Sequence, residues 1–189
     1  MISTNQRRST RYVQLVVKRA FDIAASVMVL LVLSPLFLLT SLAIKLESHG
    51  PIFSVKHEYC YNGRRIQVLR FRSRSRRSVT VIGRFLTRSG LNQLPMLINV
   101  LRGEMSIVGP SCHVALPSIP LSDQLSRALL NSPFRPGLIS FEGPHHERTD
   151  WEPRKIEADL FYISNWSLLL DAKILFLNLF SKATYVQNY

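Results

Sequence analysis

One stretch of the sequence constrains the fold more than any other: Ile23 to Ile44 reads IAASVMVLLVLSPLFLLTSLAI and carries no charged side chain. As an α-helix rising about 1.5 Å per residue it would reach roughly 33 Å, and the hydrocarbon core of a bilayer is about 30 Å thick. Ser34-Pro35 interrupts the run. Because proline removes a backbone donor and clashes with the preceding turn, we expect a sharp kink there. A kinked apolar helix either spans the membrane or bends and returns to the side it came from.

Basic residues flank this run on both sides. Five of them precede it: Arg7, Arg8, Arg11, Lys18 and Arg19. The region after the run is also rich in arginine. Positive charge marks cytoplasmic flanks, so this pattern favours a re-entrant helix over a simple span. We therefore divide the chain into a basic lead with the start of the membrane helix (1–22), a re-entrant or spanning helix (23–47) and a cytoplasmic domain (48–189).

The formal net charge of +12 implies an anionic partner, such as lipid headgroups, phosphorylated substrates or nucleic acid. We do not expect nucleic acid, because the arginines lack the interleaved aromatic residues of a stacking platform and no binding motif is present. The arginines from Arg64 to Arg88 more simply form a surface that faces the membrane or a phosphate. The two cysteines are too few for a disulfide framework.

Beyond the apolar run, turn signals and hydrophobic periodicity predict short elements. The membrane helix should end near Glu47-Ser48, before a His-Gly-Pro stop signal. Residues 52–72 alternate around Asn62-Gly63, which indicates a β-hairpin. Apolar spacing over 91–101 predicts a helix with Gly103 as its stop, and residues 105–110 should form a short buried strand or extended turn.

The last third of the chain predicts three helices and one turn. Helices are expected over 121–130 and 151–164, and Arg135-Pro136-Gly137 should be a rigid turn. Asn165 can cap the following helix, 166–180. That last helix is amphipathic, and it either lies on the membrane surface or packs into the core of a compact domain. The expected fold is mainly α with a small β-hairpin, an α+β class.

Several short motifs, collinear from about residue 15 to residue 180, resemble the bacterial sugar transferase family. The family comprises small monotopic polyprenol-phosphate phosphoglycosyltransferases that start exopolysaccharide, O-antigen or related glycan assembly. The motifs are Lys18-Arg19-Ala20-Phe21-Asp22, Ser34-Pro35, Gly50-Pro51-Ile52-Phe53, Asn62-Gly63, Phe71-Arg72-Ser73, Ile82-Gly83-Arg84-Phe85-Leu86, Leu94-Pro95, Asn99-Val100-Leu101, Gly103 to Pro110 (GEMSIVGP), Arg135-Pro136-Gly137, Asp159-Leu160-Phe161-Tyr162 and Asn165-Trp166-Ser167.

The resemblance implies a monotopic protein in the bacterial inner membrane, anchored in the cytoplasmic leaflet by a helix broken at Ser34-Pro35 and by interfacial amphipathic helices. In the family, an Asp-Glu pair before Leu-Pro is catalytic. Its Asp attacks the β-phosphate of a UDP-sugar, releases UMP, and passes the sugar phosphate to polyprenyl phosphate. Mg²⁺ assists and arginines hold the phosphates. The corresponding arginines here are Arg72, Arg84, Arg88 and Arg135.

This chain departs from the family at the catalytic positions, where it has Asn92-Gln93. A neutral amide is a very poor nucleophile toward phosphorus and a poor ligand for Mg²⁺. The family's Arg-Pro-Glu after Val-Gly-Pro is also changed, to Ser111-Cys112-His113. Two hypotheses follow. The chain carries out the family reaction with Mg²⁺, or it is a catalytically degenerate homologue that binds nucleotide-sugar or lipid carrier, or regulates an active homologue.

Three further groups are candidates for chemistry. Glu104 is a potential displaced carboxylate, since no Asp or Glu occurs between Glu58 and Glu104. Cys112 is either a nucleophile or an inert thiol. His145-His146-Glu147 with Asp150 is either a metal-binding group or a polar loop, and we assign no metal site to the sequence.

Overall fold

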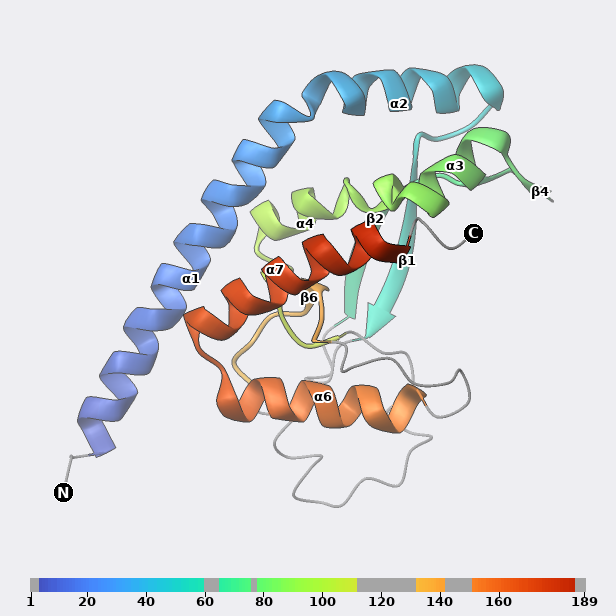
Figure 1. The fold of residues 1–189 in the computed structure, drawn as a ribbon. Coiled ribbons are helices and arrows are strands. Elements are labelled where there is room, and N and C mark those ends of the chain that lie inside the picture. Colours follow the sequence, from blue (N-terminus) through green and yellow to red (C-terminus); the bar gives the residue numbers. More distant parts are fainter. Residues whose placement is uncertain (1–3, 60–64, 76–77, 112–131, 142–150, 186–189) are drawn as a thin grey trace. The chain divides into compact units, whose positions relative to one another are not determined.

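A computed structural model describes the chain except for residues 1–3, 60–64, 76–77, 112–131, 142–150 and 186–189 (Figure 1). The described residues are mostly helical and include three two-stranded sheets, β1-β2, β3-β4 and β5-β6, so the predicted α+β class is confirmed. The helices are α1 (Thr4–Val32), α2 (Ser34–Glu47), α3 (Val81–Ser89), the 3-10 helix η1 (Leu91–Gln93), α4 (Met96–Arg102), α6 (Trp151–Asn165) and α7 (Leu168–Tyr185). The strands are β1 (Phe53–Tyr59), β2 (Arg65–Phe71), β3 (Arg74–Ser75), β4 (Ser78–Val79), β5 (Ser106–Val108) and β6 (Gly137–Ile139).

The chain forms two compact units. Unit 1 consists of Met1–Ala20, Tyr59–Arg64 and Ser106–Tyr189, and unit 2 consists of Phe21–Glu58 and Arg65–Met105. Helix α1 runs without a break through residue 22 and contributes to both units. The division at residues 22 and 47 predicted above concerns the membrane boundary and stays a prediction.

The apolar run is bent where Ser34-Pro35 predicts it: α1 and α2 form a pair of helices at 64° to each other (Figure 1). Pro35 has no N–H to reach the carbonyl of Leu31, four residues earlier. The Ser34 hydroxyl donates to that carbonyl instead, at 2.8 Å. The dipeptide therefore both breaks the helix and satisfies the acceptor that the break would leave open. Helix α2 ends at Glu47, as predicted.

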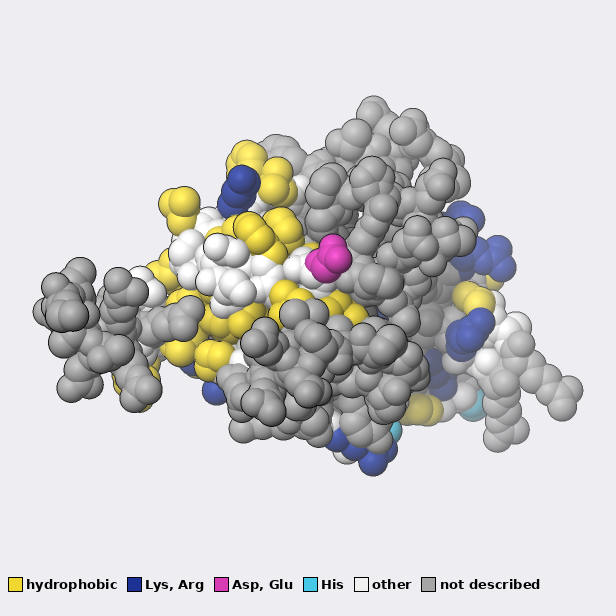
Figure 2. Space-filling view, turned by 90° about the horizontal axis from the view of Figure 1, so that it is seen from below, with side chains coloured by type: hydrophobic (Ala, Val, Ile, Leu, Met, Phe, Trp, Pro, Cys, Tyr) yellow, Lys and Arg dark blue, Asp and Glu magenta, His cyan; other side chains and the backbone are white. Residues whose placement is uncertain are grey.

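The burial pattern of α1 is the reverse of that of a helix in a water-soluble domain. Its buried positions are polar: Lys18, Asp22 and Ser26, spaced four residues apart, are only 6%, 3% and 0% exposed. Most of its large apolar side chains are between 38% and 71% exposed: Tyr12, Val13, Val16, Val17, Phe21, Ile23, Val27, Met28, Val29, Leu31 and Val32. Figure 2 shows hydrophobic side chains at the surface beside Lys and Arg side chains. Among the described helices none alone has the length and hydropathy of a membrane span, although the bent pair 12–32 and 34–47 passes that test together.

In unit 2 the core lies between α2, α3 and the β1-β2 sheet. The connection between the two strands is too short for a parallel crossover, so they pair as the predicted hairpin, whose Asn62-Gly63 turn lies outside the described residues. Phe71 at the end of β2 is 1% exposed, and its ring lies 4.8 Å from that of Phe37 and 5.7 Å from that of Phe53. Ile44 and Leu86 complete this cluster, which fixes α2 and α3 against the sheet.

In unit 1, β5 and β6 pair in parallel, with Ser106 opposite Gly137 and Val108 opposite Ile139. The buried strand predicted at 105–110 is thus confirmed. The rigid turn predicted at Arg135-Pro136-Gly137 is wrong, because Gly137 is the first residue of β6. Gly137 allows the backbone of β6 to lie close to that of Gly109, because a Cβ at Gly137 would be 2.2 Å from the nitrogen of Gly109.

The predicted C-terminal helices are present as α6 and α7, but the predicted cap is wrong. Asn165 ends α6, where its Nδ2 donates to the carbonyl of Phe161 at 3.0 Å. Ser167 caps α7 instead, since its hydroxyl accepts from the N–H of Leu170 at 3.1 Å. The helix predicted over 121–130 lies outside the described residues.

Helix α7 has one buried side and one exposed apolar side. Asp171 and Ile174 are 7% and 2% exposed, whereas Leu169 and Phe176 are 81% and 61% exposed. One side of α7 therefore packs in unit 1, and the other leaves apolar surface uncovered. Placement of that second side on a membrane stays a prediction.

Candidate functional site

The residues at the catalytic positions suggested by the resemblance, Asn92 and Gln93, form part of η1, between α3 and α4. Helix α3 stops at Gly90, whose φ of 75° lies in the left-handed region that favours glycine. Pro95 cannot donate into a continuous α-helical ladder, so the helix predicted over 91–101 is a 3-10 turn followed by α4. Gly103, with φ 84°, ends α4 as predicted.

The side chains of Asn92 and Gln93 are half-buried, and neither makes a hydrogen bond or ion pair to another described residue. Both are neutral amides, which neither attack phosphorus readily nor attract Mg²⁺ as carboxylates do. Within the described ranges, no group of three or more His, Cys, Asp or Glu is placed to hold a metal ion. The residues at this position therefore do not fit the Mg²⁺ chemistry that an Asp-Glu pair would support.

Glu104, the candidate displaced carboxylate, is held by a buried amide that the sequence reasoning did not single out for a role. Asn99 is 0% exposed, and its Nδ2 donates to Glu104 Oε2 and, at 2.7 Å, to the carbonyl of Gln67. Its Oδ1 accepts from the N–H of Leu69 at 3.0 Å. Asn99 thus ties β2 to α4 and orients Glu104. The available signal was a polar residue inside an otherwise apolar helical stripe.

Arg84 and Arg88 lie four residues apart on α3 and are both exposed. The structure brings these two together on one helix face, a single turn before η1. Arg135 is exposed and lies two residues before β6, in unit 1, whereas Arg84 and Arg88 belong to unit 2.

Arg72 has a structural position at the end of α2. Its Nη2 donates to the carbonyl of Ser48 at 2.8 Å and its Nη1 donates to that of His49 at 3.3 Å. Gly50, with φ 141°, leaves room for this guanidinium, since a Cβ there would lie 2.0 Å from Nη1. Nη1 and Nη2, which would bind a phosphate, therefore already donate hydrogen bonds to backbone carbonyls.

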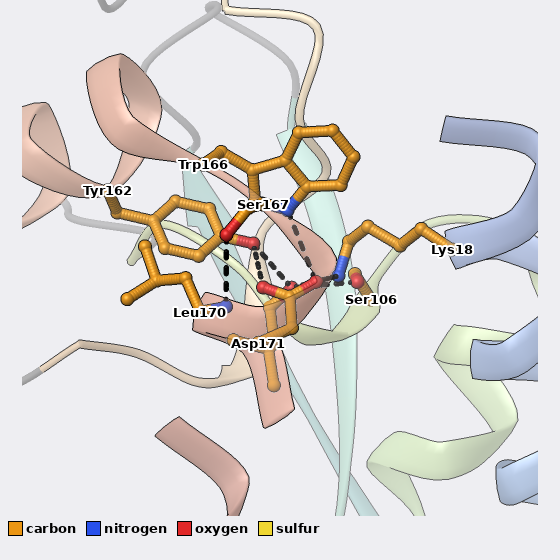
Figure 3. Close-up of polar contacts among 8 residues, drawn as sticks. Lys18, Ser106, Tyr162, Trp166, Ser167, Leu170 and Asp171 are labelled. Carbon is orange, nitrogen blue, oxygen red and sulfur yellow. Dashed lines mark hydrogen bonds and ion pairs between the residues drawn. The ribbon is translucent and has the colours of Figure 1, made fainter. Parts of the chain in front are cut away.

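A buried polar cluster around Asp171 joins α1, β5, α6 and α7 within unit 1 (Figure 3). Lys18 Nζ donates to Asp171 Oδ2 at 2.6 Å and to the carbonyl of Val108 at 2.9 Å. From the opposite side, Tyr162 donates to Oδ1 at 2.8 Å and Trp166 Nε1 donates to Oδ2 at 3.2 Å. This buried ion pair, with its additional donors, joins the middle of α1 to the C-terminal helices.

A second buried carboxylate holds the segment after β5. Asp159 is 0% exposed, and both of its oxygens accept from the N–H of Ser111 at 3.1 Å. The Ser111 hydroxyl lies 3.4 Å from Oδ1. The resemblance implies an arginine at this position in the family, whereas here the serine and its backbone N–H contact the carboxylate. The other candidates, Cys112 and the group His145-His146-Glu147 with Asp150, lie outside the described residues.

Comparison with known proteins identifies a family and several relatives. The family described as "Bacterial sugar transferase" matches residues 13–184. The chain is 36% identical to an undecaprenyl-phosphate glucose phosphotransferase of Komagataeibacter xylinus, an alignment covering 92% of this chain and 37% of the relative. It is 34% identical to a UDP-glucose:undecaprenyl-phosphate glucose-1-phosphate transferase of Escherichia coli (strain K12), over 89% of this chain and 41% of the relative.

A third relative is similar along nearly its whole length. The exopolysaccharide production protein PSS of Rhizobium leguminosarum bv. phaseoli is 34% identical, and the alignment covers 90% of this chain and 96% of that protein. The first two relatives are longer, and the chain spans about two fifths of each. The family match covers most of the chain, from the first half of α1 to nearly the end of α7. The chain therefore belongs to the bacterial sugar transferase family.

Proposed function

We propose that this chain acts in exopolysaccharide or related glycan synthesis, at the step where hexose-1-phosphate passes from a UDP-sugar to polyprenyl phosphate. The observation that carries the proposal is the match to the family over residues 13–184 together with relatives whose names state this chemistry. The predicted partners are a UDP-sugar, polyprenyl phosphate and membrane lipids.

The proposed location is the bacterial inner membrane, with most of the chain on the cytoplasmic side. Support comes from the buried polar and exposed apolar sides of α1, since lipid is the solvent that accepts such a surface. On α2, exposed leucines continue this surface: Leu38, Leu39, Leu42 and Leu46 are 56% to 78% exposed. The 64° bend and the basic flanks support a re-entrant path over a span.

Phosphate binding is proposed for Arg72, Arg84, Arg88 and Arg135. Arg84, Arg88 and Arg135 are exposed and can reach a ligand without rearrangement of the core. Arg72 would have to share its guanidinium with the carbonyls at the end of α2. Among the four, it is therefore the one whose replacement should affect folding as well as binding.

The second candidate function is that of a homologue without turnover, which binds the substrates or regulates an active relative. The specific observation in its favour is the Asn92-Gln93 pair, because neither amide forms the acyl phosphate that a carboxylate would. The surrounding scaffold, from Gly90 to Gly103, keeps well-formed caps and turns. Loss of chemistry and retention of fold are therefore compatible in this chain.

UMP release separates the two functions. Membranes containing the chain would be assayed with a panel of UDP-sugars, polyprenyl phosphate and Mg²⁺, beside membranes containing the Asn92→Asp/Gln93→Glu variant. The matched control is Gln14→Glu/Gln67→Glu, which adds two carboxylates on α1 and β2 instead of η1 and removes no side-chain hydrogen bond to a described residue. If the unchanged chain releases UMP, the first proposal, an active transferase, is supported. If only the Asn92→Asp/Gln93→Glu variant releases UMP, the second proposal, a homologue that does not turn over substrate, is supported.

If the unchanged chain releases UMP, its nucleophile is sought first at Glu104, whose carboxylate Asn99 already orients. Glu104→Gln should then abolish release while the fold is retained. If neither the unchanged chain nor the η1 variant releases UMP, Ser111 in place of the family's arginine also matters. That outcome would contradict the first proposal and favour a binding or regulatory role.

A further inference from the structure

The hairpin of unit 2 has an uncovered edge on β1. The β1-β2 sheet has two strands, so β1 pairs with β2 on one side and with no other described strand on its other side. Four consecutive residues of β1, Ser54 to His57, are exposed, and Val55 is 50% exposed. An edge of this kind presents backbone donors and acceptors with which a strand of another chain can pair.

The backbone groups that point outward from β1 belong to Val55 and His57. The N–H of Arg72 donates to the carbonyl of Ile52 at 2.9 Å, so the backbone of Ile52 faces β2. In an antiparallel pair, alternate residues turn their backbone groups toward the same neighbour. Residues 54, 56 and 58 therefore face β2, whereas Val55 and His57 face away from it. Within the described part of the chain, neither of these two residues has a backbone hydrogen bond beyond the sheet.

The opposite edge of the sheet, on β2, is covered. There Asn99 donates to the carbonyl of Gln67 at 2.7 Å and accepts from the N–H of Leu69 at 3.0 Å. Asn99 is 0% exposed, so its side chain takes the place of a third strand along this edge. The two edges of the sheet thus differ, and β1 is the one whose backbone groups are open to a second chain.

The charges on β1 distinguish the registers in which two copies of this strand can pair antiparallel about a two-fold axis. An axis at Val55 sets Lys56 opposite Ser54 of the second copy, and an axis at Lys56 sets two lysines opposite each other. An axis at His57 sets Lys56 opposite Glu58 of the second copy, and symmetry repeats this pair on the other side of the axis. Opposite charges directly across an antiparallel pair stabilise it, whereas like charges oppose it.

Glu58 has an oxygen available for this contact. Its Oε1 lies 3.2 Å from Lys56 Nζ and 3.6 Å from Arg70 Nη2 of the same chain. Its Oε2 forms no ion pair or hydrogen bond with a described residue. The Lys56 side chain is 60% exposed, so its ammonium group can extend across to a neighbouring strand. A lysine on an edge strand opposes pairing with another chain unless a carboxylate lies opposite it, and one register of β1 supplies that carboxylate.

We infer that two copies of this chain associate through β1, antiparallel and with the two-fold axis at His57, and so form a four-stranded sheet in the order β2-β1-β1-β2. Hydrogen bonds between the backbones of the two His57 residues hold the strands together, and the two Lys56–Glu58 pairs select the register. The inference goes beyond the proposed function, because it does not depend on whether the chain turns over substrate.

Disulfide cross-linking of the full chain tests this register. His57→Cys and Val55→Cys are each made together with Cys60→Ser and Cys112→Ser, and membranes containing the protein are treated with a mild oxidant. With the axis at residue 57, the two Cα atoms at that position lie about 5.5 Å apart, within the range that a disulfide spans. The two Cα atoms at position 55 lie roughly 14 Å apart, beyond that range. We therefore expect at least about tenfold more cross-linked dimer from His57→Cys than from Val55→Cys.

A charge reversal tests what selects the register. Added to the His57→Cys chain, Lys56→Glu sets two carboxylates opposite each other on both sides of the axis, so cross-linking should fall about fivefold. The control Arg102→Glu makes the same change at an exposed side chain on α4 of the same unit and should leave cross-linking unchanged. Because both positions are exposed, thermal unfolding of the two variants should be similar.

Three results would overturn the inference. Equal cross-linking at positions 55 and 57 would mean that the strands meet by random collision or in another register. Absence of cross-linking at position 57 would show that β1 does not pair with a second copy, and sedimentation of the detergent-solubilised protein would then show whether a dimer forms through another surface. An equal response to Lys56→Glu and Arg102→Glu would show that the charges of β1 do not select the register.

Discussion

At the residue scale, Asp171 is the centre of the buried polar cluster of unit 1. It is 7% exposed and accepts from Lys18, Tyr162 and Trp166. Asp171→Ala leaves the Lys18 ammonium buried without its counter-ion, so we expect a loss of about 3–5 kcal/mol in the free energy of unfolding. Denaturant unfolding of the detergent-solubilised protein measures it.

The control for this variant is Lys173→Ala, which changes an exposed charge on the same helix and should shift the unfolding free energy by no more than about 0.5 kcal/mol. The double variant Lys18→Met/Asp171→Leu should recover part of the loss, since it removes both buried charges. Equal unfolding of Asp171→Ala and Lys173→Ala would show that the cluster does not stabilise unit 1.

Asn99 allows a comparison between two Asn→Asp changes. At Asn99 the new carboxylate would face the carbonyl of Gln67 and the carboxylate of Glu104, and both hydrogen bonds from Nδ2 would be lost. We expect Asn99→Asp to destabilise unit 2 by about 1–3 kcal/mol. Asn92→Asp should have a much smaller effect, because that amide bonds to no described residue. Equal effects in thermal unfolding would contradict the role given to Asn99.

At the element scale, Ser34-Pro35 sets the angle between α1 and α2. Restoring a backbone donor with Pro35→Ala should straighten the pair, because residue 35 can then reach the carbonyl of Leu31. For spin labels at Val17 and Leu46 the separation should lengthen from roughly 37 Å to roughly 43 Å, given a bend of 64° and a rise of about 1.5 Å per residue.

The control for the straightening is Leu42→Ala, which removes an exposed side chain of α2 and leaves the dipeptide unchanged. Pulsed electron–electron distance measurement in lipid discs reports both variants. An unchanged separation in Pro35→Ala would mean that packing of α2 on Phe71 and Leu86 imposes the bend, with proline only accommodating it.

Elements governed by local signals could be predicted from the sequence. The kink at Ser34-Pro35, the end of α2, the paired strands β1 and β2, and the stop at Gly103 each follow from a few neighbouring residues. The β5-β6 pairing could not, because its partners are about thirty residues apart and Gly137 carries the same local signal as a turn.

The candidate site shows the same limit. The altered pair Asn92-Gln93 was visible in the sequence. The hydrogen bonds of Arg72 were not, because the guanidinium donates to the carbonyls of Ser48 and His49, more than twenty residues earlier in the chain. The ion pair between Lys18 and Asp171 joins residues 153 positions apart. In the sequence, only the presence of a single acidic residue in the apolar helix 166–180 pointed to a buried partner. Such contacts are set by tertiary packing, which periodicity does not encode.

At the scale of the whole molecule, the uncovered apolar surface is the feature that bears on the proposed membrane location. The exposed sides of α1, α2, α3 and α7 carry large apolar residues, while α1 buries Lys18, Asp22 and Ser26. In water such a surface contributes nothing to folding, because the unfolded chain exposes it as well. In the proposed membrane location, its transfer to lipid would contribute about 25 cal/mol per Å² of apolar area.

If the helix pair is re-entrant, a charge introduced on α2 should oppose membrane insertion more strongly the deeper its position lies in the bilayer. Leu38 and Leu46 are 69% and 78% exposed, so arginine at either position leaves the core of unit 2 unchanged. Leu38 is near the bend, where a re-entrant helix is deepest, and a charge there should oppose insertion by about 2.5–3.5 kcal/mol. Leu46 adjoins Lys45 and Glu47, where an arginine can extend to the headgroups. After an alkaline carbonate wash, Leu38→Arg should therefore be released from membranes and Leu46→Arg retained. Release of both, or retention of both, would contradict a helix pair that enters the bilayer at Glu47 and turns at Ser34-Pro35.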